Sequence, residues 1–186
     1  LHPRLRSGAS RRQSSRPVRL RSGPILTKII SGGQTGADWA ALDWAITQQV
    51  PHGGWCPLGR LAENGVIDPR FQLRETPSPN YAVRTRWNVR DSDATVLFTL
   101  SAQPTGGSLL TWNEAAALGK PRLHLSAAVE EPHAEILLRF LQAYQVAELN
   151  IAGPRASTEP DIGRFVTRVL DEALLDQGDP EADSAD

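Results

Sequence analysis

Short β-rich runs alternate with amphipathic stretches along the middle of the chain, from about residue 25 to residue 175. The clearest periodicity lies near the end of this region. Five apolar residues there are spaced at i, i+3, i+4, i+7 and i+8, which predicts a helix with one buried face. They are Ile162, Phe165, Val166, Val169 and Leu170. The alternation as a whole predicts parallel strands joined by crossover helices.

Five strands and five helices are expected. The strands cover residues 25–31, 54–56, 94–100, 121–125 and 147–152. The helices cover residues 37–48, 78–90, the segment from 105–108 to Gly119, 131–144, and the closing stripe, with Ser78 and Thr158 as N-terminal caps. This order predicts an α/β fold, a three-layer, Rossmann-like, doubly wound parallel sheet in a single domain.

The composition is that of an ordinary folded domain, with 40% hydrophobic and 22% charged residues. No apolar run approaches the roughly 20 residues that a membrane helix needs, so we expect no membrane association. A single cysteine, Cys56, excludes an intrachain disulfide. It favours a reducing, cytoplasmic setting.

Charge is concentrated at the two ends of the chain. Residues 1–24 carry seven arginines and no acid, whereas residues 176–186 carry five acids and no base. We expect both ends to be disordered, with a ligand-binding domain at 25–175 between them. The basic arm is interpreted as a nucleic-acid arm, an organellar transit peptide, or a segment foreign to the natural protein, which the absence of methionine favours. The region between the ends is mildly acidic, which argues against nucleic-acid binding by the domain.

A glycine-rich turn, SGGQTGAD at residues 31–38, follows the first strand and opens a helix. Glycines let an anion approach the backbone, and the helix start presents free N–H groups and a partial positive charge. No lysine follows, so an ordinary NTPase P-loop is not expected. The competing interpretation is a tight turn capped by Thr35 and Asp38. A Gly33→Asp variant is expected to fold but to lose a phosphorylated ligand. The candidate ligand-binding residues are Gly32, Gly33, Gln34, Thr35, Gly36 and Asp38.

A second turn, TGGS at residues 105–108, repeats the arrangement after the strand 94–100. Ser108 either caps the helix or contacts an anion, and Thr111 lies one turn further along. Two such turns predict a cleft at the switch point of one sheet. The candidates here are Gly106, Gly107, Ser108 and Thr111.

Charged residues between the two turns supply further candidates. On a helix, Arg86 and Arg90 share a face suited to a phosphate or carboxylate, although a self-neutralising surface cluster is an equally simple interpretation. The glycine-rich loop 52–65 has the form of a ligand-covering segment, with Arg60 and Glu63 as its charged candidates. Cys56 is expected to be buried. No spacing of cysteine, histidine and carboxylate residues indicates a zinc site.

Five segments in order resemble the proposed molybdenum-cofactor (Moco) carrier family. They are IISGGQTGAD at 29–38, PHGGWCPLGR at 51–60, YAVRTRWNVRDSDAT at 81–95, TGGSLLT at 105–111 and LNIAGPRAS at 149–157. This family belongs to the Rossmann-like group that includes the lonely-guy type nucleotide phosphoribohydrolases. The resemblance implies a homo-oligomeric domain that holds molybdenum cofactor (molybdopterin) by its phosphate and pterin. It also implies storage, protection and delivery of this cargo to a molybdoenzyme.

The resemblance also implies residue roles and an alternative. Residues 32–36 and 106–108 would grip the phosphate, with Arg86, Asn88 and Asp93 as polar neighbours. The alternative is a phosphoribohydrolase acting on a nucleoside monophosphate, since those enzymes use a PGGxGTxxE turn. Here TGGSLLTWNE places Asn113 at the glutamate position and Glu114 one residue late, a rotation of about 100° on a helix. Asp38, Asp91 or Asp93 would then supply the carboxylate. A non-catalytic nucleotide-sensing module is the third hypothesis.

Overall fold

The protein is described here by a computed structural model that covers residues 26–175. The expected arm and tail lie outside the described residues. Five parallel strands form the central sheet in the order β2-β1-β9-β7-β8. They are β1 (Lys28–Ile30), β2 (His52–Gly53), β7 (Ala94–Thr99), β8 (Arg122–Ser126) and β9 (Glu148–Ala152). In the middle of the sheet, Val96 pairs with Leu123 on one side and with Ile151 on the other.

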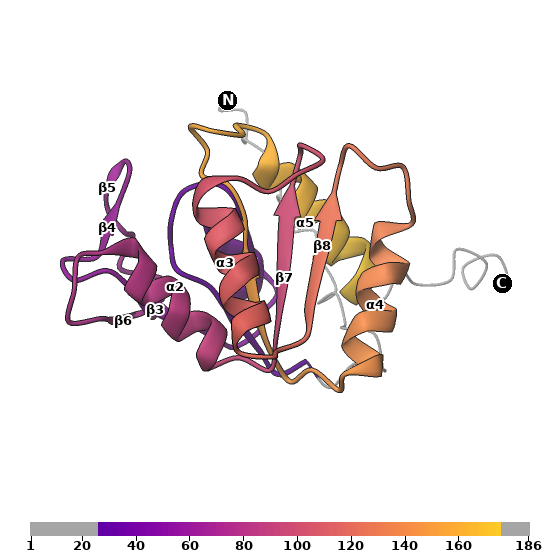
Figure 1. The fold of residues 1–186 in the computed structure, drawn as a ribbon, viewed down its shortest axis with the longest axis horizontal. Helices are drawn as coiled ribbons and strands as arrows, with labels where there is room; N and C mark the ends of the chain where they lie inside the picture. Colours follow the sequence, from indigo (N-terminus) through magenta and orange to yellow (C-terminus); the bar gives the residue numbers. More distant parts are fainter. Residues whose placement is uncertain (1–25, 176–186) are drawn as a thin grey trace, which may run out of the picture.

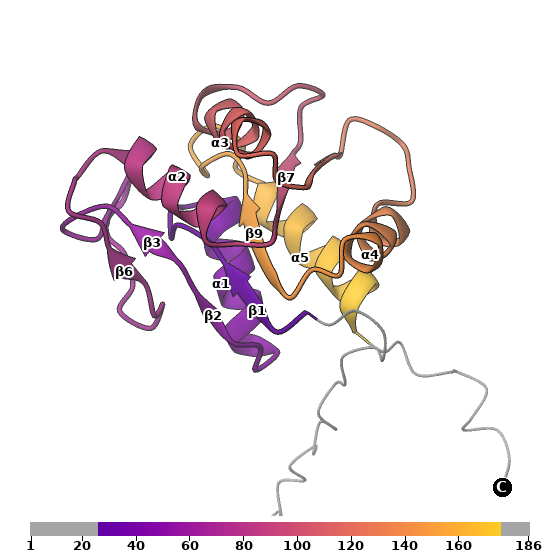
Figure 2. The ribbon, with the colours of Figure 1, turned by 60° about the horizontal axis from the view of Figure 1, so that its bottom comes forward.

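Helices cover both faces of this sheet, so the predicted three-layer α/β fold is confirmed. One face carries α1 (Ala37–Thr47), α4 (His133–Ala143) and α5 (Ile162–Leu174), and the other carries α2 (Tyr81–Arg90) and α3 (Gly106–Ala117) (Figures 1 and 2). None of the helices in the described part of the chain has the length and apolar character that a membrane crossing requires.

The main core lies between the sheet and the layer of α1, α4 and α5. The five residues of the predicted stripe on α5 are all buried in it, as amphipathic periodicity requires. A smaller cluster of Leu42, Cys56, Ile67 and Phe71 fixes the long connection between β2 and α2 against α1. Cys56 is a free, buried thiol, as expected.

The expected strand at 54–56 is divided differently in the structure. The edge of the central sheet is β2, and the chain leaves the sheet at Gly54, whose φ is +133°. A side chain at Gly54 would meet the carbonyl oxygen of Ser31 at 2.2 Å. Beyond it, β3 (Trp55–Cys56) pairs with β6 (Arg74–Glu75) in a separate small sheet, and β4 (Leu61–Ala62) and β5 (Gly65–Val66) form a hairpin.

Two expected helix caps are wrong. Helix α2 begins at Tyr81, with Asn80 as the N-cap, and Asn80 Oδ1 accepts the N–H of Ala82 at 2.9 Å. Ser78 instead accepts the N–H of Asn80 through its hydroxyl. Helix α5 begins after Asp161, whose side chain makes no capping hydrogen bond among the described residues. In both places a local turn occupies the residues that the sequence pattern assigned to the helix start.

Both glycine-rich turns lie at the carboxyl end of the sheet. The first leads from β1 into α1 on one face, and the second leads from β7 towards α3 on the other face. Strand β9 lies between β1 and β7. The connections that leave β1 and β7 therefore run to opposite faces of the sheet on either side of the carboxyl end of β9. A doubly wound sheet opens a crevice where its connections diverge in this way.

Candidate functional site

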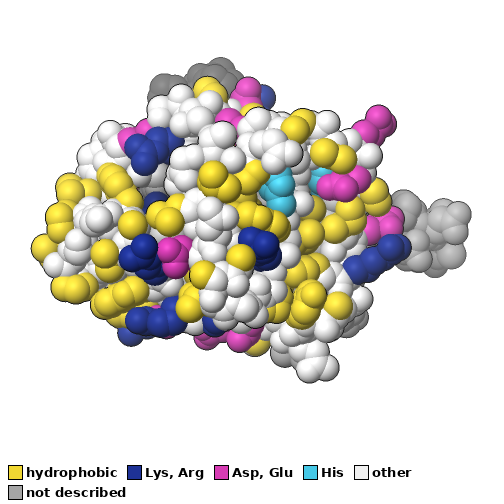
Figure 3. Space-filling model, viewed as in Figure 1, with side chains coloured by type: hydrophobic (Ala, Val, Ile, Leu, Met, Phe, Trp, Pro, Cys, Tyr) yellow, Lys and Arg dark blue, Asp and Glu magenta, His cyan; other side chains and the backbone are white. Residues whose placement is uncertain are grey.

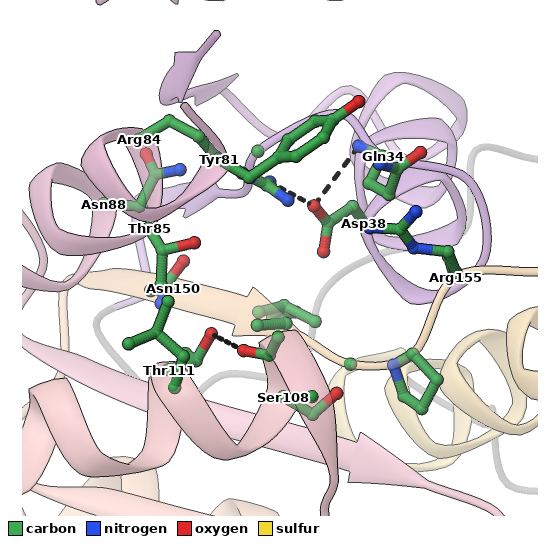
Figure 4. Close-up of a pocket in the computed structure, with 18 of the residues that line it drawn as sticks. Gln34, Asp38, Tyr81, Arg84, Thr85, Asn88, Ser108, Thr111, Asn150 and Arg155 are labelled. Atoms are coloured by element: carbon green, nitrogen blue, oxygen red, sulfur yellow. Dashed lines mark hydrogen bonds and ion pairs between the residues drawn. The ribbon is translucent and has the colours of Figure 1, made fainter. Parts of the chain in front are cut away.

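A cavity of about 380 Å³ occupies this crevice (Figure 4). Its walls are one face of α2, the start of α3, the end of β9 with the loop that follows, and the first glycine-rich turn. We call this cavity the cleft. Eight of the fourteen predicted ligand-binding residues line it: Gly32, Gln34, Asp38, Asn88, Gly106, Gly107, Ser108 and Thr111.

The start of α3 is open towards the cleft. Thr105 is its N-cap and makes no side-chain capping bond. Within residues 26–175, the N–H groups of Gly106 and Gly107 have no acceptor, as the first turn of a helix leaves them. A side chain added at either glycine would meet no atom within 4 Å, so the backbone is bare there. Ser108 is 4% exposed. Its hydroxyl likewise has no hydrogen-bond partner in the described chain.

The first glycine-rich turn is closed by the protein's own groups. The N–H of Gln34 donates to Asp38 Oδ2 at 3.2 Å, that of Thr35 to Gln34 Oε1, and that of Ala37 to the carbonyl of Pro154. The guanidinium of Arg84 lies directly over Gly32, where an added Cβ would meet it at 1.4 Å. The two turns are therefore not equivalent: the backbone at Gly32 is covered by Arg84, whereas the backbone at Gly106 and Gly107 is bare.

Asp38 and Arg84 form a buried ion pair at the cleft wall. Arg84 Nη1 donates to Asp38 Oδ2 at 2.7 Å, with 13% and 5% of the two side chains exposed. Two nearby polar atoms, Arg84 Nε and Gln34 Nε2, are buried with no hydrogen-bond partner among the described residues. Buried donors without an acceptor are costly, so this wall of the cleft contains two N–H donors whose hydrogen bonds are not formed within the described residues.

Three residues of the first turn lie outside the cleft lining. Gly33, at φ +79°, is covered by Leu73 and Ile67, where an added Cβ would meet Leu73 at 2.6 Å. Gly36 packs against the carbonyl of Pro154. Thr35 donates its hydroxyl to Glu63 instead of capping α1. These residues shape the turn, and the expectation that Gly33→Asp folds conflicts with the packing around Gly33.

Arg60, Arg86 and Asp93 also lie outside the lining, and each has a partner elsewhere. Arg60 donates to the backbone carbonyls of Asp68, Phe71 and Leu73 in the long connection. Arg86 pairs with Glu114 at 2.8 Å on the outer surface. Asp93 accepts the N–H groups of Ala147 and Glu148 at the amino end of the sheet, opposite to the cleft.

The cleft contains polar residues that the sequence analysis missed. Tyr81, Arg84 and Thr85 share a face of α2 with Asn88, at spacings i, i+3, i+4 and i+7. That spacing was a usable signal, because choosing Asn88 as a neighbour of the ligand selects the same face. Thr105, Asn150, Arg155 and Thr158 complete the missed polar lining.

Glu63 ties the β4–β5 hairpin to the rim of the cleft. Its carboxylate accepts the hydroxyls of Ser157 and Thr35 and the N–H of Ser157, and it lies 3.9 Å from Arg155 Nε. The hydrogen bonds from Ser157 and Thr35 lower the pKa of Glu63. Arg155 also lies over the ring of Tyr81, 5.6 Å from its centroid. Glu63 therefore helps to hold the loop that carries Arg155.

Charges of both signs are interspersed on the face that α2 and α3 form (Figure 3). Arg90 pairs with Asp91 beside Arg86 and Glu114, so neighbouring charges compensate each other. The hydrogen bonds from Arg90 lower the pKa of Asp91 to about 2. This face offers no extended basic track of the kind that binds a phosphate backbone.

Comparison with known proteins agrees with this geometry. Residues 29–174 match the model of the circularly permutated YpsA SLOG family. The chain is similar to the crystal structure of a proposed molybdenum carrier protein from Syntrophus aciditrophicus SB, with 43% sequence identity and a TM-score of 0.78. That alignment covers 81% of this chain and 96% of the other. No curated protein matches the sequence. Because the family model covers almost all of the described domain, the chain belongs to the circularly permutated YpsA SLOG family.

Proposed function

We propose that the cleft binds a phosphorylated small molecule, molybdenum cofactor, and that the protein stores, protects and delivers it. The observation that carries this proposal is the open start of α3. The bare N–H groups of Gly106 and Gly107 and the unpaired hydroxyl of Ser108 face a cavity of suitable size. A helix N-terminus with free N–H groups is a favourable place for a phosphate.

The charge of the cleft supports an anionic ligand. Arg84 and Arg155 line it, and Asp38 is the acidic residue in the same lining. Arg84 is neutralised by its close ion pair with Asp38 at 2.7 Å, whereas Arg155 lies 3.9 Å from Glu63, so Arg155 and the α3 dipole are better placed to act on the phosphate. Arg155 is partly exposed, with 42% of its side chain accessible, so a ligand in the cleft can reach it.

The metal of the cargo would be held by the cargo itself. Among the described residues, no group of three or more histidine, cysteine, aspartate or glutamate side chains is placed to hold a metal ion. The cleft lining contains neither cysteine nor histidine. Binding through phosphate and pterin leaves no protein–metal bond to break, which suits a protein that hands its ligand on.

Hydrolysis of a nucleoside monophosphate is the second candidate, and the presence of Asp38 in the lining favours it. The other carboxylates considered from the sequence have partners outside the cleft. Glu114 pairs with Arg86, Asp91 with Arg90, and Asp93 with backbone N–H groups. A single carboxylate is fewer than the pair that glycoside hydrolysis ordinarily uses.

A co-elution experiment tests the proposal. The purified protein is incubated without oxygen with cofactor released from a molybdoenzyme, passed through a gel-filtration column, and assayed for pterin by fluorescence after oxidation. Pterin in the protein peak, at an amount that saturates as more cofactor is added, is the expected result. Pterin only in the small-molecule fractions, or release of free base from nucleoside monophosphates, would refute it. The homo-oligomeric state, the cytoplasmic setting and the recipient molybdoenzyme stay predictions.

A further inference from the structure

Asp38 leaves one carboxylate oxygen unused. Its Oδ2 accepts both Arg84 Nη1 and the N–H of Gln34. Its Oδ1 has no hydrogen-bond partner within residues 26–175, and Figure 4 shows that oxygen directed into the cavity. Only 5% of the side chain is exposed, so this acceptor serves the cleft and not the outer surface.

A phosphate cannot occupy the position next to this oxygen, because two negative charges in a poorly solvated site repel each other. A bound molecule must therefore present a hydrogen-bond donor to Asp38 and its anionic group elsewhere. The open start of α3 forms a different wall of the same cleft. The cleft thus accommodates a ligand with a phosphate at one end and N–H or O–H donors at the other.

Tyr81 indicates which kind of donor belongs there. Its ring lines the cleft beside Asp38, with Arg84 and Arg155 at 5.8 and 5.6 Å from its centroid (Figure 4). Flat aromatic rings stack on tyrosine and arginine side chains. A stacking side chain next to a carboxylate acceptor fits a planar heterocycle whose edge carries N–H groups.

We infer that Asp38 selects ligands with a 2-amino-4-oxo pyrimidine edge, the ring edge that pterins and guanine share. Its N–H and amino groups are adjacent donors, and both suit a carboxylate oxygen. Adenine lacks this arrangement, and hypoxanthine lacks the amino group. The inference rests on the proposed function, which places the phosphate at α3, and adds the chemical class of the ring and the residue that reads it.

The test compares three probes by calorimetry: GMP, IMP and ribose 5-phosphate. GMP and IMP differ only by the 2-amino group, and ribose 5-phosphate lacks the base. Wild-type protein should bind GMP at least about tenfold more tightly than IMP, since hydrogen bonds to charged groups are among the stronger ones. Asp38→Asn should abolish this preference, while ribose 5-phosphate, which has no base for Asp38 to contact, should still bind. Ser108→Ala should weaken all three probes alike.

The outcomes separate the inference from the proposed function. Equal affinity of the wild-type protein for GMP and IMP overturns the inference alone, and it requires no variant that might misfold. Failure of GMP to bind while pterin still co-elutes with the protein overturns the inference, and failure of both overturns the phosphate site and with it the proposed function. Release of guanine from GMP by the wild-type protein and not by Asp38→Asn makes Asp38 a catalytic residue and also overturns the inference. An unfolded Asp38→Asn variant leaves the wild-type comparison decisive.

Discussion

Arg84 and Asp38, 46 positions apart in the chain, meet at 2.7 Å across the junction of α1 and α2. This ion pair fixes α2 against the first glycine-rich turn and places the guanidinium over Gly32. It also keeps the second carboxylate oxygen available to the cleft. The pair therefore stabilises the fold and defines one wall of the site.

Replacing Arg84 with leucine should destabilise the protein by about 2 kcal/mol, because the carboxylate of Asp38 loses its counter-ion in a buried place. The cost is below the largest values for enclosed pairs because Oδ1 faces the cavity. Urea unfolding measures the change in the free energy of unfolding. The double variant Arg84→Leu with Asp38→Asn should recover part of the loss. Equal stability of the single variant and the wild type would show that the pair contributes nothing.

Gly107→Asp should abolish binding of a phosphorylated ligand without harming the fold. An added side chain meets no protein atom there, and an acidic residue in the first turn of a helix interacts favourably with its dipole. The same charge faces the incoming phosphate, so affinity should fall by at least about tenfold. Ligand titration and thermal unfolding measure the two effects.

Leu109→Asp is the matched control for that variant. Leu109 lies in the same turn of α3, is 42% exposed and does not line the cleft, so the same charge is added away from the site. Binding should persist in the control. Equal loss of binding in both variants would indicate a general charge effect and would contradict phosphate binding at the start of α3.

Gly33→Ala should destabilise the protein by about 2 kcal/mol or more. Its φ of +79° strains any L-residue, and its Cβ would lie 2.6 Å from Leu73. A fall in melting temperature is the expected observation. An unchanged melting temperature would mean that Leu73 and Ile67 yield freely, and that Gly33 is no structural requirement of the turn.

The fold follows from the sequence because its periodicities are strong and local. The stripe on α5 is recognised from its spacing, and the buried strands β7 and β9 are recognised from their short, mostly apolar runs. The division of the segment around residue 54 was not predicted, because a single glycine with positive φ redirects the chain there from the central sheet to a second, small sheet. Glycine is required at this position because a Cβ would meet the carbonyl oxygen of Ser31. Ser31 is distant in the sequence, so no local pattern reveals this contact.

The site was predicted less completely, for two physical reasons. The helix start at Gly106 and Gly107 was found because glycine turns act through their own backbone. On α2, Arg86 was chosen, yet it lies two residues from Asn88 and therefore on another face, whereas Arg84 shares the face of Asn88. Arg155 follows β9, a strand whose central place in the sheet is known only once the strand order is known.

Glu63 should make stability depend on pH in the acidic range. Its pKa is lower in the folded protein than its ordinary value of 4.5, so its stabilising effect is present above that value and disappears as the pH falls through the folded pKa. Glu63→Gln should therefore lower the melting temperature at pH 7, and the difference from wild type should shrink below about pH 4.5. A difference independent of pH would assign the effect to packing instead of charge.

The most direct test of the proposed function is native mass spectrometry of freshly purified wild-type and Gly107→Asp proteins, followed by identification of any released molecule. We expect the wild-type protein to carry a pterin phosphate, with or without molybdenum, and the variant to carry none. A wild-type protein that carries nothing and binds no added cofactor, or a variant that retains the same bound mass, would contradict it.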